Sequence, residues 1–186
     1  MFVDSLLGDV PSRSLTVRAL RQITGLELQH IPDRQNIPRG PGVYVWAPCV
    51  DCGVWYIGSG SGWNGLWSRL GTWFSALEAM RSDNVGPDPL VENGAAWWVP
   101  AVRAAHLNQL QCYGSALLQG SDPGAKVWEA RMQQANRIAS GNVSVLGGGA
   151  WENKAGSLAH EADKWAWEQL LKMQREAVVR PVVTRS

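Results

Sequence analysis

Three side chains have the types that are needed to bind and hydrolyse a phosphate ester: Tyr44, Tyr56 and Arg69. A guanidinium is always charged and binds phosphate oxygens through paired donors. A phenol can donate to such an oxygen or relay a proton, although its ordinary pKa near ~10 must be lowered before it acts as a base. Because negative charge builds up on the non-bridging oxygens during cleavage, a cation placed there stabilises the transition state. These residue types indicate phosphodiester chemistry, provided that the fold brings them together.

The segments around the two tyrosines predict a β-hairpin. Residues 43–46 and 54–57 are rich in β-branched and aromatic side chains, as strands are, and residues 47–53 contain the turn formers Pro, Asp and Gly. Since side chains alternate between the two faces of a strand, Tyr44 and Tyr56 can converge on one side of this hairpin. Gly58 is expected to end the second strand and to allow a ligand or the backbone to come close.

A helix is predicted directly after a glycine-rich loop. Apolar residues recur at helical spacing from residue 66 to residue 80, and Asn64 is an acceptable N-cap. Arg69 falls within the first two turns of this helix. From there its guanidinium can reach back over the strand ends that carry the tyrosines.

The order Gly42-Val43-Tyr44, then Tyr56-Ile57-Gly58, then Arg69 in a Leu-x-x-Arg-Leu setting resembles the opening of the GIY-YIG endonuclease family. The resemblance covers residues 40–81 closely and 142–184 loosely. It implies a small α/β (α+β) fold with a three-stranded antiparallel sheet flanked by helices. It also implies a phosphodiester hydrolase that uses Mg²⁺ or Mn²⁺ and acts on DNA, as restriction, phage and mobile-element nucleases do.

The resemblance further implies a metal-binding glutamate on the helix that follows the third strand. Glu168, in a helix predicted over residues 157–177, is our first choice as metal ligand and catalytic residue. Glu161 lies two turns earlier on nearly the same face, and Glu129 lies closer to the arginine along the sequence, so both remain alternatives. Thr184 stands where the family usually has Asn, and Ser59 where Lys is frequent.

The catalytic roles that the resemblance implies can be stated residue by residue. Tyr44 would accept or relay the proton of the attacking water. Tyr56 would hydrogen-bond the phosphate or the nucleophile. Arg69 would hold the scissile phosphate.

The domain organisation follows from the position of the motif. Residues 1–40 are interpreted as an N-terminal extension with a short helix over 16–23, and residues 41–186 as the nuclease-like domain. The stretch from about 82 to 141 is interpreted as a helical insertion. The remaining predicted elements are helices over 100–118 and 125–139, and a third strand over 142–146 with 96–102 as the alternative.

Composition is compatible with a globular nucleic-acid enzyme. The 186 residues are 45% hydrophobic and 18% charged, and no apolar run is long enough to cross a membrane. The start of the chain has no signal-peptide pattern and there are only three cysteines, so we expect a cytoplasmic protein. The net charge is only +1, so a basic DNA-binding face requires clustering of arginines. The candidates are Arg13, Arg18, Arg21, Arg34, Arg39, Arg175, Arg180 and Arg185.

Several alternatives stay open at this point. Cys49 and Cys52 have zinc-like spacing, and Cys112 with His106 could complete a site. The 11 tryptophans fit packing in a core better than base stacking. The chain could instead be an RNase or nuclease toxin, or an inactive nucleic-acid-binding module of the same fold. A dimer is possible, and the sequence specificity cannot be derived from these motifs.

Overall fold

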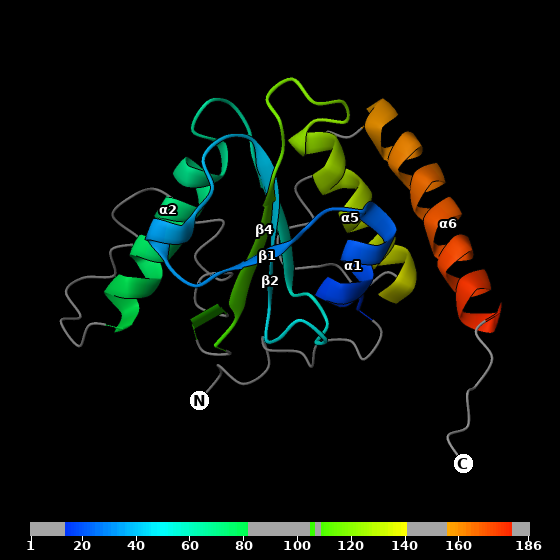
Figure 1. Ribbon diagram of the computed structural model, residues 1–186, viewed down its shortest axis with the longest axis horizontal. Helices are drawn as coiled ribbons and strands as arrows, with labels where there is room; N and C mark the ends of the chain where they lie inside the picture. The colour runs from blue at the N-terminus through cyan, green and yellow to red at the C-terminus, as the bar shows by residue number, and fades with distance from the viewer. Residues whose placement is uncertain (1–13, 82–104, 107–108, 141–155, 180–186) are drawn as a thin grey trace, which may run out of the picture.

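The computed structural model describes residues 14–81, 105–106, 109–140 and 156–179 (Figure 1). Within this part of the chain, four antiparallel strands form one sheet in the order β1-β4-β2-β3. The strands are β1 (Gln29–Ile31), β2 (Gly42–Ala47), β3 (Tyr56–Gly60) and β4 (Gln111–Ala116). The short strand β1 and the motif strand β3 are therefore the two edges of the described sheet.

Helices cover both faces of this sheet. They are α1 (Val17–Thr24), the short 3₁₀ helix η1 (Arg34–Asn36), α2 (Gly65–Arg81), α5 (Ala125–Ser140) and α6 (Gly156–Val179). Figure 1 shows α2 on one side of the sheet, α1 and α5 on the other, and α6 as an outer layer beyond α5. The mixed α+β class that the sequence predicts is thus confirmed, although the sheet has one strand more than expected.

The hairpin and most of the predicted helices are confirmed, but the second strand is β3 (Tyr56–Gly60), which starts later than predicted and continues past Gly58, where we expected it to end, because Ser59 and Gly60 pair with β2. In the hairpin, Tyr44 lies opposite Gly58 and Trp46 opposite Tyr56. The predicted helices near residues 16–23, 64–80, 125–139 and 157–177 correspond to α1, α2, α5 and α6. Helix α1 begins where the Thr16 hydroxyl accepts a hydrogen bond from the Ala19 N–H. These elements carry strong local signals, namely apolar periodicity, caps and turn residues.

The predicted helix over residues 100–118 is wrong for residues 111–116, which form β4. This strand pairs with β2 on one side and with β1 on the other, so it lies inside the sheet. Its four central residues are all buried, because both of its faces are covered. A strand covered on both faces lacks the alternation of polar and apolar residues that identifies a strand in a sequence. The third strand predicted over 142–146 and its alternative over 96–102 lie outside the described residues.

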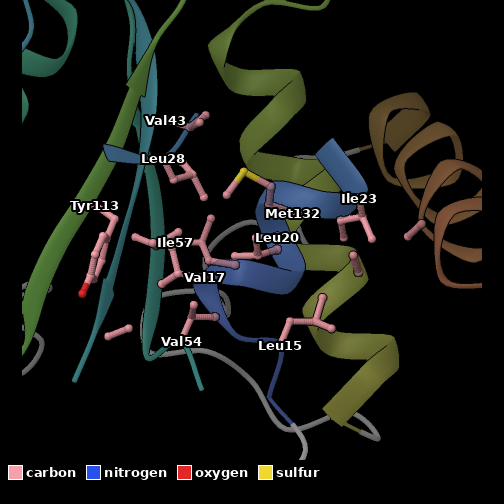
Figure 2. Close-up of a cluster of buried hydrophobic side chains, with 14 residues drawn as sticks. Leu15, Val17, Leu20, Ile23, Leu28, Val43, Val54, Ile57, Tyr113 and Met132 are labelled. Atoms are coloured by element: carbon pink, nitrogen blue, oxygen red, sulfur yellow. The ribbon is translucent and has the colours of Figure 1, made fainter. Parts of the chain in front are cut away.

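The chain before the motif contributes to the same core as the sheet. Helix α1 and strand β1 both belong to the segment that we interpreted as an N-terminal extension. Figure 2 shows Val17 and Leu20 of α1 pointing toward the sheet, with Met132 of α5 beside them. All three side chains are completely buried. Likewise β4 and α5, from the segment interpreted as an insertion, form a central strand and a cover of the sheet.

Among the described helices, none combines the length and the apolar character needed to cross a lipid bilayer.

Candidate active site at the edge strand β3

The two motif tyrosines stack on the α2 face of the sheet. The ring centroids of Tyr44 and Tyr56 are 5.9 Å apart, with an angle of 27° between the ring planes. The Tyr44 ring lies over Gly58, where an added Cβ would be 2.6 Å from the Tyr44 hydroxyl oxygen. Only glycine at this position leaves room for the phenol. The predicted convergence of the two tyrosines is therefore confirmed.

Arg69 joins this pair from the second turn of α2. Its guanidinium is half-buried and interacts with both phenols. Burial alone would lower the pKa of Arg69, but the neighbouring Tyr44 and Tyr56 more than offset this effect, and the net pKa is raised. The site thus contains a permanent positive charge directly beside two hydroxyl groups.

Tyr44 is in its neutral form in this environment. The side chain is completely buried, and its hydroxyl has no hydrogen bond of normal geometry to the described residues. Burial raises the pKa of Tyr44 well above the ordinary tyrosine value, and Tyr56 raises it further, while Arg69 opposes both effects. As arranged here, Tyr44 can donate a proton in a hydrogen bond, but it is a poor base.

Trp73 closes the aromatic cluster one turn after Arg69. Its ring centroid lies 5.0 Å from that of Tyr56 and 5.1 Å from that of Trp46. Trp73 and Trp46 are both buried, so the phenols belong to an aromatic cluster between the sheet and α2. This cluster keeps water away from the Tyr44 hydroxyl and strengthens its interaction with Arg69.

A second polar cluster lies on the opposite face of β3. The Ser59 hydroxyl donates to the Glu129 carboxylate (2.5 Å), and the Lys126 ammonium contacts the same oxygen at 3.0 Å. The Gln133 amide donates to the Ile57 carbonyl (3.1 Å) and makes a long contact of 3.4 Å with the other Glu129 oxygen. Glu129 is buried, which is unusual for a glutamate. Because side chains alternate along a strand, this carboxylate lies on the face of β3 opposite Tyr56.

The structure does not bring Glu168, our first choice as metal ligand, near the tyrosines. Glu168 and Glu161 are both exposed on α6. Helix α6 packs mainly against α5 and to a smaller extent against α1, as the outer layer in Figure 1. Tyr44, Tyr56 and Arg69 lie on the other side of the sheet. Of the three candidate glutamates, Glu129 is the one that contacts the motif strand.

The Glu129 cluster has the donor chemistry for a hard divalent cation. A carboxylate oxygen is a preferred ligand of Mg²⁺, which is commonly held by one or two carboxylates together with water and phosphate oxygens. Among the described residues, no group of three or more His, Cys, Asp or Glu side chains converges, so Glu129 would be a single protein ligand. The Glu129 Oε2 atom already contacts Ser59 and Lys126. The Oε1 atom makes a long contact with Gln133 and is therefore more accessible to a cation.

The cysteines adopt a different arrangement from the zinc alternative. Cys49 and Cys52 form a disulfide in the turn between β2 and β3. Their sulfur atoms are bonded to each other rather than presented to a metal. Cys112 is a buried free thiol of β4, and burial raises its pKa well above the ordinary value.

Sequence reasoning did not identify three members of the Glu129 cluster, namely Ser59, Lys126 and Gln133. A usable signal was present. Lys126, Glu129 and Gln133 follow one another at spacings of three and four, which places all three on one face of a helix. The position of Ser59 beside that face is a tertiary contact, which no local pattern reveals.

Comparison with known proteins adds no relative. No protein-family model, no curated protein and no solved structure matches this chain.

Proposed function

We propose that this protein is a metal-dependent endonuclease that hydrolyses phosphodiester bonds in DNA, as its resemblance to the GIY-YIG family implies. One observation supports the proposal most: the Arg69 guanidinium lies against the stacked phenols of Tyr44 and Tyr56 over a glycine of the edge strand. An ordinary core hairpin does not need a half-buried arginine at its tyrosines, because burying a charge costs free energy unless the charge has a use or a partner.

The helix ends near β3 support binding of a phosphate at the same place. Figure 1 shows α2 and α5 beginning at the upper edge of the sheet. At this edge the end of β3 packs closely on the start of α2, at Gly60 and Gly65, while Ser59 bonds to α5. Helix N-termini carry partial positive charge, which favours anions.

Each residue then has a role. Arg69 binds the scissile phosphate and stabilises the charge that develops on its oxygens. Tyr56 donates a hydrogen bond to the phosphate or to the attacking water. Glu129, on the opposite face of β3, would hold a divalent cation, which would supply charge neutralisation and a water molecule of lowered pKa. Tyr44 orients its partner as a neutral phenol, and it accepts a proton only where added positive charge lowers its raised pKa.

Plasmid cleavage is the direct test. Purified protein is incubated with supercoiled DNA in Mg²⁺, Mn²⁺ or EDTA, beside Arg69→Ala and Arg69→Lys. We expect metal-dependent nicking or linearisation that falls about 10²–10³-fold in Arg69→Ala, the usual effect of removing a group that stabilises transition-state charge. Arg69→Lys keeps the charge without the paired donors and should recover only part of the rate.

The metal ligand is tested by a matched pair of variants. Glu129→Gln keeps the size and the hydrogen-bonding capacity of the side chain but removes its charge, and should abolish cleavage. Glu168→Gln makes the same change on exposed α6 and should leave cleavage unchanged. The reverse pattern would assign the metal to Glu168 and would require α6 to move relative to the sheet.

The complete burial of Tyr44 favours one second candidate, a nucleic-acid-binding module without catalytic activity. A folded protein that binds DNA but cleaves neither DNA nor RNA with any metal would establish this alternative. Cleavage of RNA alone would identify an RNase.

A further inference from the structure

Two arginines gather on the flank of α2 opposite Arg69. The guanidinium carbons of Arg34 and Arg39 lie 5.8 and 5.5 Å from the ring centroid of Trp67, so both arginines rest against one indole. Residues two apart on a helix point in nearly opposite directions, so Trp67 and Arg69 occupy opposite flanks of α2. We call the three residues Arg34, Arg39 and Trp67 the arginine cluster.

The two arginines have no acidic partner among the described residues. The ion pairs of the described chain involve other residues, and both Arg34 and Arg39 are exposed. Arg18 shows the contrast, since it is equally a surface arginine but is paired with Asp51 at 2.6 Å. Two like charges gathered on one ring without a counter-charge raise the local positive potential and favour a bound anion.

The arginine cluster has a defined position relative to Arg69. The Gly40 carbonyl, next to Arg39, accepts a hydrogen bond from the Leu66 N–H at the start of α2 (2.8 Å). Arg34 donates to the Ser75 hydroxyl on α2 (3.3 Å). Backbone and side-chain contacts therefore hold both arginines to the helix that carries Arg69.

We propose that the arginine cluster binds the phosphate backbone of duplex DNA beside the cleavage site. A guanidinium stacked on an indole keeps its N–H donors, which lie in its own plane, available for phosphate oxygens. The DNA backbone then crosses the N-terminal turns of α2, from the arginine cluster on one flank to Arg69 on the other. This inference rests on the proposed function, because it supplies the DNA contact that a net charge of +1 does not predict.

Binding without cleavage tests this proposal by itself. Fluorescence anisotropy of a labelled duplex is measured in EDTA from about 50 to 200 mM salt, a range over which each phosphate contact has a large effect. The proteins compared are the wild type, the double variant Arg34→Ala/Arg39→Ala and the control Arg18→Ala, each with its fold verified by circular dichroism. We expect the slope of log affinity against log salt to become shallower by about 2 in the double variant, roughly one unit for each lost phosphate contact. Arg18→Ala should keep the wild-type slope, since its charge is already paired.

The proposal would be overturned by a wild-type slope in the double variant, by an equal loss in Arg18→Ala, or by no binding of duplex DNA by the wild type. Binding of RNA in place of DNA would also overturn it. The two proposals can fail separately. If cleavage does not depend on the arginine cluster, the nuclease proposal is kept and the binding proposal is rejected. If the cluster is needed for binding but no cleavage occurs, only the DNA-binding proposal is kept.

Discussion

The two faces of the sheet are packed from different kinds of side chain. Under α1 and α5 the core is mainly aliphatic, with Leu20, Ile57 and Met132 among its buried members (Figure 2). Under α2 the core is richer in aromatic rings, with Tyr44, Trp46, Tyr56 and Trp73 buried there against Tyr113 alone among the described residues of the first face, and we call it the aromatic face. The aliphatic face has little chemistry to offer apart from the Glu129 cluster at its edge, whereas the aromatic face encloses two phenols and a guanidinium.

The faces also differ in how their buried hydroxyl groups are satisfied. The Tyr113 hydroxyl, on a residue of the aliphatic core, donates to the Gln111 side chain at 2.7 Å. On the aromatic face, the Tyr44 hydroxyl and the Trp46 indole nitrogen make no hydrogen bond of normal geometry to the described residues, although Arg69 lies beside the Tyr44 hydroxyl. The α5 side has two such atoms, the Arg131 Nε and the amide nitrogen of Asn136. A buried polar group without a partner costs about 1–3 kcal/mol, so its retention at Tyr44 is consistent with a functional role.

The largest effect on stability is expected from the aliphatic face. Leu20→Ala should lower the free energy of unfolding by about 2–5 kcal/mol, because Leu20 is completely buried and its removal leaves a cavity. Urea denaturation measures this change. The control Leu118→Ala, at a side chain that is 84% exposed, should stay within about 0.5 kcal/mol of the wild type. Equal effects of the two variants would contradict the assignment of the main core to this face.

An intermediate effect, with opposite signs on the two faces, is expected when a tyrosine hydroxyl is removed. Tyr44→Phe removes a buried hydroxyl that makes no hydrogen bond of normal geometry and should stabilise the fold by about 1 kcal/mol, whereas Tyr113→Phe breaks a hydrogen bond and should destabilise it by about 0.5–1.5 kcal/mol. Thermal or urea unfolding measures both variants.

Cleavage assays on the same two variants relate this comparison to function. Tyr44→Phe should lose cleavage but keep DNA binding, while Tyr113→Phe should keep both. Full cleavage by Tyr44→Phe would remove Tyr44 from the mechanism, and a loss of stability in that variant would show that its hydroxyl has a partner after all.

The smallest effect is expected from alkaline pH, again mainly on the aromatic face. Burial raises the pKa of both Cys112 and Tyr44 well above their ordinary values. The unfolded chain therefore loses these protons at lower pH than the folded chain. The contribution of each group to the free energy of unfolding is fully present below its ordinary pKa, which is ~8.5 for Cys and ~10 for Tyr. This contribution is lost as the pH rises from that value toward the pKa in the folded state.

Urea unfolding at pH 7, 9 and 10 measures this decrease. Cys112→Ala should remove the part of the stability loss that begins at the lower pH, and Tyr44→Phe should remove the part that begins at the higher pH. Tyr113→Phe should alter it less, because burial raises the pKa of Tyr113 by a smaller amount. Stability that does not change up to pH 10 in the wild type would show that these groups are not buried from water.

Much of the candidate site could be predicted from the sequence, because its signals are local. The motif tyrosines lie on adjacent strands of one hairpin, and Arg69 lies on the helix that follows, so short connections bring the three side chains together. The choice among Glu129, Glu161 and Glu168 could not be made in this way. All three occur in helical patterns, and which helix lies against β3 depends on packing between distant segments.

The sequence by itself determined the hairpin, the positions of α1, α2, α5 and α6, and the convergence of the two tyrosines, since periodicity, caps and turn residues act over a few residues. Only the tertiary structure decided that residues 111–116 form β4 and that Glu129 contacts Ser59. Strand β4 is stabilised by pairing with β2 and β1, which are distant in the sequence. The contact of Glu129 with β3 likewise depends on the burial of α5 against the sheet. Such interactions depend on the whole fold, and a local segment does not encode them.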